Sequence, residues 1–338
     1  MTINIAGSST YISEAGKVTG FGHLSRVSAL IDISSNVGTL KSWCVLDDMK
    51  LSYKRAQEMT SKTTEFVTCL GVLENTNFRH GIAYVDGARI DIDALHWKDV
   101  EICVVMSPLV RIPRFRSASF FRGRTLPTTW KHKKGDVIGL GREYAVVPTY
   151  VSELRKQAHP KKLTHEGPFV LSLMLGEHPS EKAWTTVKNI SDELLKFGNL
   201  EIRAPEGVAT VVKHLLKMET IDRLKIVSFQ TSHSWNEISS SDLVVATAGQ
   251  SLVESLCLGM PTIAIPTHEV HAAFVRELLD FGACLEYPIG GLSSTQTMRL
   301  VHRILSDDDR CDLAQKAQAA IDGQGAYRIH EAIQQMAF

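Results

Sequence analysis

A histidine and an arginine three residues apart follow two glycines near the start of the chain. The stretch is GFGHLSR over residues 20–26, and apolar residues at helical spacing follow it. Glycines let the backbone pass close to a ligand, and the start of a helix presents N–H groups with a partial positive charge. His23 and Arg26 share one face of such a helix. The stretch predicts a phosphate or carboxylate site that Gly20, Gly22 and Arg26 would contact, with His23 as a titratable group.

A second stretch in the other half of the chain has a similar design. An apolar strand expected over residues 243–246 runs into the small residues of TAGQS (247–251), where a helix begins. Small residues at such a turn expose N–H groups to a phosphate, and a carboxylate one turn later can accept hydrogen bonds from ribose hydroxyls. An ordinary capped β–α–β unit explains the same spacing equally well. The candidate contacts are Thr247, Gly249, Gln250, Ser251 and Glu254.

Three more polar side chains follow predicted strands. Asp86 ends a strand expected over residues 81–85, and a carboxylate at that end of a parallel strand faces the ligand crevice. A turn aspartate before Gly87 is an equal alternative. His178 and His268 follow two further predicted strands and could contact phosphate or sugar, although a loop histidine is more often only solvated.

The elements that must position these residues alternate between strand and helix. In the second half, continuous apolar strands alternate strictly with helices, which predicts a doubly wound parallel sheet. The first half also reads as α/β, with a strand at Ile3–Ala6 and a polar loop from Gly7 to Thr19. Residues 151–167 are polar without apolar periodicity and predict a linker. We expect domains over residues 1–150 and 168–338.

Composition limits the classes of partner. The 37 basic residues equal the 37 acidic ones, so no overall field favours nucleic acid, and we expect none as a partner. The six cysteines lack metal-ligand or disulfide spacing, and no metal or other cofactor is expected. Neither a signal sequence nor an apolar run of about 20 residues is present, which predicts a cytoplasmic protein.

A basic and aromatic segment interrupts the first half over residues 109–136. Basic residues mixed with aromatic ones suit an anionic surface such as lipid headgroups or a pyrophosphate-linked acceptor. A solvated loop whose aromatic rings pack into their own domain is the simpler interpretation. Membrane-surface association through residues 111–134 is the alternative to that loop. The residues concerned are Arg111, Arg114, Phe115, Arg116, Phe120, Phe121, Arg122, Arg124, Trp130, Lys131, Lys133 and Lys134.

Four motifs together resemble a known family. They are GFGHLSR (20–26), LGREYA (140–145), GQSLVESLCLGMP (249–261) and DGQGAYRI (322–329). They are similar to those of GT-B nucleotide-sugar enzymes, above all the UDP-sugar hydrolase of pseudaminic acid biosynthesis and its spore-coat-polysaccharide relatives, with a glycosyltransferase-28-like C-terminal domain. The resemblance implies two facing Rossmann-like domains with an interdomain cleft. The first would hold the acceptor and the second the nucleotide sugar.

The chain departs from that family at loops that would line the cleft. Residues 176–179 read GEHP where the hydrolases carry Gly-Gly-Ser-Asp, and His268, Glu269 and His271 replace an Asn-Gln pair. The basic segment has no obvious counterpart. The resemblance therefore supports the fold and leaves the reaction open.

We expect an inverting, metal-independent glycosyltransferase of bacterial surface-glycan biosynthesis, such as capsule or other polysaccharide. His23 is the first candidate for the general base and Asp86 the second. The donor would be CMP- or UDP-linked. The His178-Pro179 dipeptide, also seen in CMP-sialic-acid transferases, favours a CMP-linked, pseudaminic-type nonulosonic acid. The acceptor would be a glycan or a lipid-linked molecule. A nucleotide-sugar hydrolase and a non-catalytic sugar- or lipid-binding protein are the alternatives.

Overall fold

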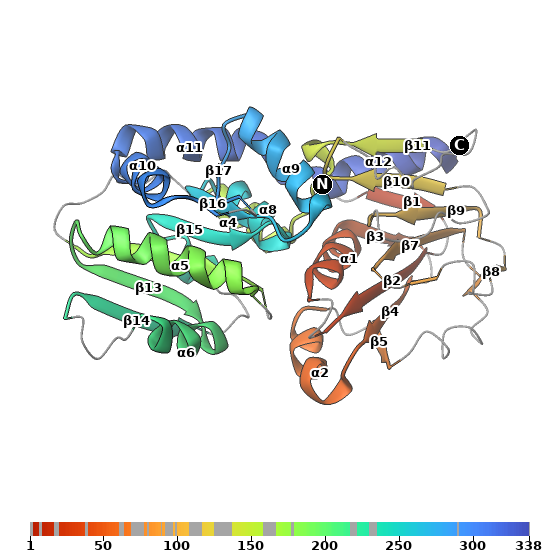
Figure 1. Cartoon of the computed structure of the whole chain (residues 1–338). Coiled ribbons are helices and arrows are strands. Elements are labelled where there is room, and N and C mark those ends of the chain that lie inside the picture. Colours follow the sequence, from red (N-terminus) through yellow and green to blue (C-terminus); the bar gives the residue numbers. More distant parts are fainter. Residues whose placement is uncertain are drawn as a thin grey trace. The chain divides into compact units, whose positions relative to one another are not determined.

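The computed structural model divides the chain into two units, which are described separately (Figure 1). The first comprises Met1–Thr149 and Gly323–Phe338, and the second comprises Tyr150–Asp322. Within them the structure describes residues 3–6, 9–16, 20–37, 40–60, 64–68, 78–79, 81–88, 90–91, 97–98, 100–107, 117–124, 137–157, 167–176, 179–216, 222–229, 235–288 and 291–337.

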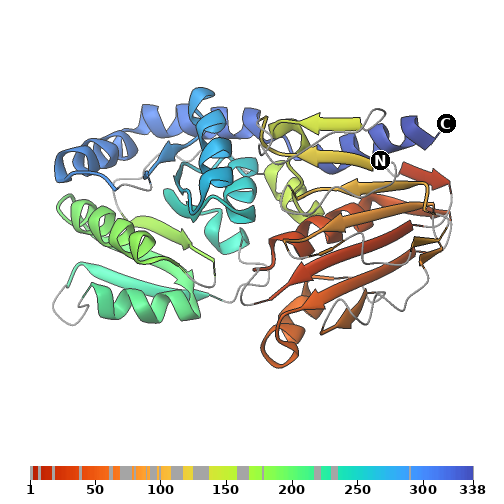
Figure 2. The same cartoon turned by 45° about the vertical axis from the view of Figure 1, so that its right-hand side comes forward.

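The first unit is built on a seven-stranded parallel sheet in the order β11-β10-β9-β7-β2-β4-β5 (Figure 2). The order turns between β2 and β7, and such a reversal is where α/β sheets bind ligands. Two-stranded pairs β1–β3 and β6–β8 accompany it. The strands are β1 (Ile3–Ala6), β2 (Ser9–Ala15), β3 (Ser34–Val37), β4 (Leu40–Leu46), β5 (Thr64–Val67), β6 (Phe78–Arg79), β7 (Ile82–Asp86), β8 (Trp97–Lys98), β9 (Ile102–Val105), β10 (Ser117–Phe121) and β11 (Val137–Leu140).

Strand β2 corrects the prediction of a loop from Gly7 to Thr19. Every residue of β2 is buried, and it pairs with β4 on one side and β7 on the other. Four of its seven residues are polar, so it lacks the apolar run by which a buried strand is recognised. Two of those side chains find partners inside the protein: the Ser13 hydroxyl lies 3.5 Å from the Trp43 carbonyl, and Glu14 accepts the Ala88 N–H. The buried Thr10 hydroxyl has no hydrogen-bond partner among the described residues.

Helices α1 (Gly22–Ile33) and α12 (Gly325–Ala337) share one core with this sheet. The unit also contains α2 (Met49–Glu58) and the short helix η2 (Arg142–Tyr144). We expected residues 168–338 to form the second domain, but the chain returns to the first unit at Gly323. The reason is the apolar face of α12: Ile329 and Ile333 are buried beside Leu30 and Tyr84.

Strand β10 changes the interpretation of the basic and aromatic segment. Phe120 and Phe121 are 2% and 4% exposed and belong to the cores on opposite faces of the sheet. The expectation that these two rings contact a membrane is therefore wrong, because strand alternation buries one on each side. Residues 108–116 and 125–136 lie outside the described residues, and with them most of the basic side chains.

The second unit contains a six-stranded parallel sheet in the order β14-β13-β12-β15-β16-β17, which reverses between β12 and β15. The predicted doubly wound parallel sheet is confirmed. Its strands are β12 (Phe169–Met174), β13 (Leu200–Pro205), β14 (Leu224–Phe229), β15 (Leu243–Thr247), β16 (Thr262–Ile265) and β17 (Leu285–Glu286). Its helices are α4 (Thr149–Arg155), α5 (Glu181–Leu194), α6 (Glu206–Leu215), α7 (Trp235–Ile238), α8 (Gln250–Cys257), α9 (Glu269–Asp280), α10 (Ser294–Leu305) and α11 (Asp307–Ala320).

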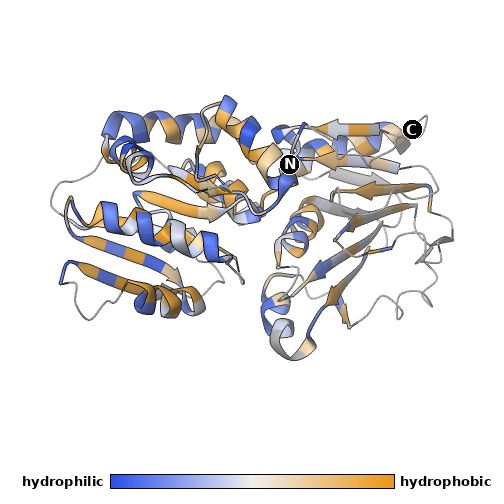
Figure 3. Ribbon diagram, in the orientation of Figure 1, coloured by the Kyte–Doolittle hydropathy of each residue, from blue (hydrophilic) through white to orange (hydrophobic). Residues whose placement is uncertain are grey.

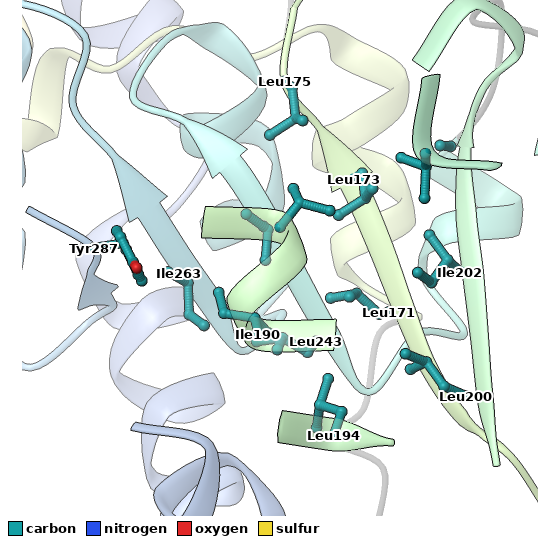
Figure 4. Close-up of a cluster of buried hydrophobic side chains, with 14 of the residues drawn as sticks. Leu171, Leu173, Leu175, Ile190, Leu194, Leu200, Ile202, Leu243, Ile263 and Tyr287 are labelled. Atoms are coloured by element: carbon teal, nitrogen blue, oxygen red, sulfur yellow. The ribbon is translucent and has the colours of Figure 1, made fainter. Parts of the chain in front are cut away.

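Apolar strand residues and one face of α5 form the core of this unit. Ile190 and Leu194 of the helix pack with Leu171, Leu243 and Ile263 of three neighbouring strands (Figure 4). The helix alternates hydrophilic and hydrophobic residues while β15 is hydrophobic along most of its length (Figure 3). This is the pattern of a sheet covered by amphipathic helices. Among the described residues no helix combines the length and the apolarity that crossing a membrane requires.

Candidate active site

The N-terminal end of α1 lies beside the carboxyl end of β2, where the order of the first sheet turns. Gly16 and Gly20 exchange two backbone hydrogen bonds, of 3.1 and 2.8 Å. Gly20 has a φ of 71°, which a residue with a side chain adopts only under strain. Helix α1 then begins at Gly22, and no side chain caps its first turn. Of the two predicted glycines, Gly20 shapes the turn that brings His23 to this edge of the sheet, and Gly22 is the first residue of the helix.

Asp86 is the last residue of the neighbouring strand β7 and is completely buried. Side chains alternate between the faces of a strand, so Asp86 shares the face of Ile82 and Tyr84, which pack against α1. The register places Ser13 of β2 opposite Asp86. Because serine is small, it leaves space on this face for the side chains that reach Asp86 from the helix.

His23, Arg26 and Asp86 form a tight hydrogen-bonded cluster. His23 Nδ1 lies 2.7 Å from Asp86 Oδ1, and Arg26 Nε donates to Asp86 Oδ2 at 2.7 Å. Arg26 Nη2 lies 2.9 Å from both Asp86 Oδ1 and His23 Nδ1. The sequence offered His23 and Asp86 as alternative bases, and the structure places them in direct contact.

The charge of Asp86 is stabilised in spite of its burial. Burial alone would raise the pKa of its carboxyl group, but the Arg26 charge and then the His23 charge and both hydrogen bonds lower it to about 2. Asp86 is therefore ionised at neutral pH. A carboxylate only accepts hydrogen bonds, so the proton between the two groups belongs to His23 Nδ1, and Arg26 Nη2, which can only donate, makes its hydrogen bond to Asp86 Oδ1 and not to Nδ1.

This arrangement defines what the cluster can do chemically. With Nδ1 protonated, the lone pair of neutral His23 is on Nε2, where it can accept a proton from a hydroxyl group or from water. Asp86 fixes the tautomer and stabilises the imidazolium that forms, as in other carboxylate–histidine pairs. His23 and Arg26 are about one-seventh exposed, so both reach the surface from a largely buried position.

Glu14 supports the turn that follows Asp86, and the sequence analysis missed it inside the predicted loop. Its Oε2 accepts the Ala88 N–H at 2.5 Å, and its side chain is buried. A Cβ at Gly87 would lie 2.8 Å from the same oxygen and 2.7 Å from Ile90 Cδ1, so a larger residue at this position would require the Glu14 and Ile90 side chains to shift. No local motif marks such a residue, because its partner is 74 positions away.

Arg122 is a second basic residue near Asp86. It follows β10 directly and is partly buried. Burial, and then the Arg26 charge, lower the pKa of its guanidinium to about 9, while Asp86 acts in the opposite direction. The sequence placed Arg122 in a surface-binding segment. The signal that could have placed it here is its position two residues after Phe120 in a buried strand.

In the second unit, the predicted contacts gather where β12 and β15 end. Gly176 follows β12 with a φ of 75°, and a Cβ there would lie 3.8 Å from Thr247 Oγ1 at the end of β15. The Gly249 N–H donates to the Thr247 carbonyl at 2.6 Å, and α8 starts at Gln250 without a side-chain cap. Thr247, Gln250 and Ser251 are partly buried. Backbone N–H groups at such a helix start can bind a phosphate.

Glu254 lies one turn into α8 and is only 7% exposed. Its Oε2 accepts the Trp235 Nε1–H at 2.7 Å, which holds the carboxylate in one orientation. Tyr150 lies near it: burial, and then the negative charge of Glu254, raise the pKa of that phenol. The sequence analysis missed both aromatic residues, because Trp235 and Tyr150 are distant from Glu254 along the chain.

His268 is the N-cap residue of helix α9 and lies three residues after the end of β16. Its Nδ1 accepts the His271 N–H at 3.4 Å, and the two rings stack with centroids 3.7 Å apart. Both histidines lie toward the surface at the carboxyl edge of the second sheet. His178 lies outside the described residues. In the part of the chain that the structure describes, there is no group of three or more His, Cys, Asp or Glu side chains that could hold a metal ion.

Comparison with known proteins gives one curated relative and many similar structures. The chain is 27% identical over 109 residues to the spore coat polysaccharide biosynthesis protein SpsG of Bacillus subtilis strain 168, which is 32% of each chain. The match thus spans about one third of that relative's length. A comparison with models of protein families finds no match.

Two of the solved structures cover almost the whole chain. MurG of Acinetobacter baumannii has a TM-score of 0.58 at 12% identity, over 97% of this chain and 99% of its own. The UDP-GlcNAc 2-epimerase of Neisseria meningitidis, bound to UDP-GlcNAc, has a TM-score of 0.60 at 10% identity, over 97% of this chain and 100% of its own. At such identities the likeness shows the fold: this chain has the two parallel-sheet α/β domains of the GT-B fold.

Proposed function

We propose that this protein is an inverting glycosyltransferase that uses a nucleotide-activated sugar. The observation that carries the proposal is the His23–Asp86 pair, with Asp86 ionised and fully buried at the turn in the first sheet. Such a pair provides a general base with a fixed tautomer. The GT-B fold supports the choice of reaction, because it supplies a second α/β unit. A nucleotide can bind where the strand order of that unit's sheet reverses.

In the proposed reaction, His23 Nε2 removes the proton from an acceptor hydroxyl group. The acceptor oxygen attacks the anomeric carbon, and the bond from that carbon to the nucleotide phosphate breaks. The nucleotide leaves with the bonding electron pair, and the configuration at the carbon inverts. Asp86 stabilises the imidazolium by its hydrogen bond to Nδ1. Arg26 keeps the carboxylate ionised.

We propose that the second unit binds the donor. Phosphate would lie at the start of α8, beside Thr247, Gly249, Gln250 and Ser251, and Glu254 would accept hydrogen bonds from the ribose. UDP is the first candidate nucleotide, because the similar epimerase structure is bound to UDP-GlcNAc. A CMP-linked nonulosonic acid is the second candidate donor, because the His178-Pro179 dipeptide is also seen in CMP-sialic-acid transferases. His178 and His268 would contact phosphate or sugar.

We propose surface polysaccharide as the product class. The curated relative is described as a spore coat polysaccharide biosynthesis protein, and its match to this chain supports that class. The acceptor would be a growing glycan or a lipid-linked precursor bound by the first unit.

The test is a nucleotide panel followed by product analysis. UDP, CMP, GDP and dTDP are titrated by calorimetry, and the corresponding sugar nucleotides are then incubated with glycan acceptors. We expect selective binding of UDP or CMP, transfer with inversion, and loss of transfer in His23→Gln with nucleotide affinity unchanged. Binding of none of the four nucleotides would overturn the proposal.

A nucleotide-sugar hydrolase is the second candidate, because the same His23–Asp86 pair could activate water in place of an acceptor hydroxyl. Free sugar released without any acceptor, at a rate that acceptors do not raise, would favour it. Nucleotide-sugar binding without turnover under either condition would favour a non-catalytic binding protein.

A further inference from the structure

Asp47 closes over the residue at which the turn into α1 begins. Ala15 of β2 and Leu46 of β4 are opposite each other in the register, and the Asp47 N–H donates to the Ala15 carbonyl at 3.2 Å. A Cβ built on Gly16 would fall within the Asp47 carboxylate group. Gly16 has a φ of 146°, in the region that favours glycine. The carboxylate therefore packs on the backbone of Gly16, in the space that a side chain there would need.

Helix α2 holds the Asp47 side chain in this position. Ser52 Oγ donates to Asp47 Oδ1 at 3.3 Å, and Ser52 is only 2% exposed. The Ser52 N–H donates to the Asp48 carbonyl at 2.9 Å in the first turn of the helix. Because the donor belongs to a buried position of a helix, the orientation of the carboxylate depends on α2.

Phe21 forms a second contact between α2 and the start of α1. Its ring is 7% exposed and shares one core with Leu24 of α1 and Ala56 of α2. The Arg55 guanidinium of α2 lies 4.2 Å from the ring centroid, which is a cation–π contact. His23 follows Phe21 by two residues, in a first turn that no side chain caps. The first turn of α1 is thus held by packing against α2.

We propose that Asp47 is a positioning residue, which holds the turn between Gly16 and Gly20 in the form that places His23 against Asp86. This rests on the proposed function, in which His23 is the base. The turn has a glycine at each end and little stiffness of its own, so its neighbours must supply it. His23 Nδ1 lies 2.7 Å from Asp86 Oδ1, and a displacement of about 1 Å would exceed hydrogen-bond range.

The test observes the Nδ1 proton of His23 by NMR in the whole protein. A proton that donates to a carboxylate resonates far downfield, and its signal is assigned with His23→Gln. In Asp47→Ala we expect the signal to be lost, because the turn is free to move. Asp47→Asn should keep most of it, because the amide has the same size and its oxygen can still accept from Ser52.

Leu140→Ala is the matched control. Leu140 lies in β11 at the far edge of the same sheet and packs against the core on the face opposite α1. Its truncation destabilises the first unit without touching the turn, so the His23 signal should remain.

Kinetics provide a second measurement once the reaction is identified. In Asp47→Ala we expect kcat to fall by about 10- to 100-fold, because a displacement of about 1 Å of a reacting group can cost this much. The affinity for UDP or CMP should not change, since the second unit is proposed to bind the nucleotide. Asp47→Asn should restore most of kcat, whereas a loss of stability alone would leave kcat of the folded protein unchanged.

An unchanged His23 signal in Asp47→Ala would overturn the inference, and so would an equal loss of the signal in Leu140→Ala. Ser52→Ala serves if Asp47→Ala does not fold, because it removes only the donor to Asp47 Oδ1. We expect a smaller change of the same kind, and no change in a folded Ser52→Ala would overturn the inference as well. The NMR result does not depend on nucleotide binding. A protein that binds neither UDP nor CMP would overturn the transferase and leave the role of Asp47 standing.

Discussion

Tyr84 and His330 meet in the core of the first unit although 246 residues separate them in sequence. The Tyr84 hydroxyl lies 3.2 Å from His330 Nδ1, and His330 Nε2 lies 3.1 Å from the Leu30 carbonyl of α1. A carbonyl only accepts, so Nε2 carries the proton and Nδ1 accepts from the tyrosine. The neutral imidazole thus satisfies both contacts and ties α12 to the sheet and to α1.

This network predicts that the first unit loses stability in mild acid. Burial lowers the pKa of His330 from 6.5 to about 4, with the Leu30 contact acting weakly in the opposite direction. Between these values the unfolded chain binds a proton that the folded chain does not. Stability therefore falls as the pH drops from about 6.5 to about 4, by roughly 3 kcal/mol in full.

Hydrogen exchange of the α12 amides between pH 7 and pH 4 measures this effect. The stability of α12 is measured at each pH in the wild type and in His330→Gln, and the two pH dependences are subtracted. The subtraction is needed because carboxylates also titrate in this range. The same substitution at the exposed His214 in α6 is the control. Identical pH dependence in the wild type and His330→Gln would contradict the prediction.

Asp86→Asn should abolish most turnover while leaving the nucleotide bound. The amide has no charge to stabilise the imidazolium of His23, and Arg26 loses its ionic partner. General-base catalysis contributes about 10²- to 10⁴-fold, so we expect kcat to fall within that range. The measurement is kcat and KM for the transfer or hydrolysis reaction identified by the nucleotide panel.

Asp192→Asn is the control for that substitution, because Asp192 pairs with Lys188 on the surface of α5. Unchanged kcat in Asp86→Asn would remove the pair from the proposed mechanism. A rise in KM alone, with kcat retained, would assign Asp86 to substrate binding instead.

The sequence predicted the parallel sheets and the positions of His23, Arg26 and Asp86 at element ends. Apolar runs and helical spacing are local signals, and they were sufficient for these elements. Strand β2 escaped because Ser13 finds its partner in β4 and Glu14 finds its partner in the turn after β7, which no local pattern shows. The docking of α12 escaped for the same reason, since the Tyr84–His330 contact joins the two ends of the chain.

The candidate site could be predicted only in its parts. His23 and Arg26 lie within one motif, whereas their contact with Asp86 depends on the order of the strands, 63 positions along the chain. The opposite error occurred at Phe120 and Phe121. Their neighbours in sequence are basic, which indicated a surface, but each ring is buried in a core built by distant strands.

Gly259→Ala should destabilise the second unit more than the same change at Gly291. Both glycines have positive φ, of 70° and 81°, where alanine is strained by about 1–2 kcal/mol. A Cβ at Gly259 would also lie 2.6 Å from Gln318 Cγ, whereas a Cβ at Gly291 would have no atom within 4 Å. Urea unfolding of both variants measures the difference. Equal losses would show that Gln318 moves aside without cost.

Trp235→Phe should weaken nucleotide binding although Trp235 itself is buried. The indole Nε1–H donates to Glu254 Oε2 at 2.7 Å, and phenylalanine keeps most of the ring without the donor. A buried carboxylate oxygen that loses its donor costs about 1–3 kcal/mol, and Glu254 is then free to turn from the orientation that suits a ribose. We expect lower stability of the second unit and an affinity for UDP or CMP reduced about tenfold.

Trp184→Phe provides the matched control, because Trp184 packs on the core of the same unit from α5. Calorimetry compares UDP with pyrophosphate, or CMP with phosphate. The comparison separates the contribution of the nucleoside from that of the phosphate groups. If Glu254 binds the ribose, Trp235→Phe weakens the nucleotide and leaves the phosphate compounds unaffected. If Trp235→Phe weakened the binding of the nucleotide and of the phosphate compound equally, the substitution would instead have disturbed the phosphate site at the start of α8. If Trp235→Phe and Trp184→Phe weakened nucleotide binding equally, the effect would be a general loss of packing.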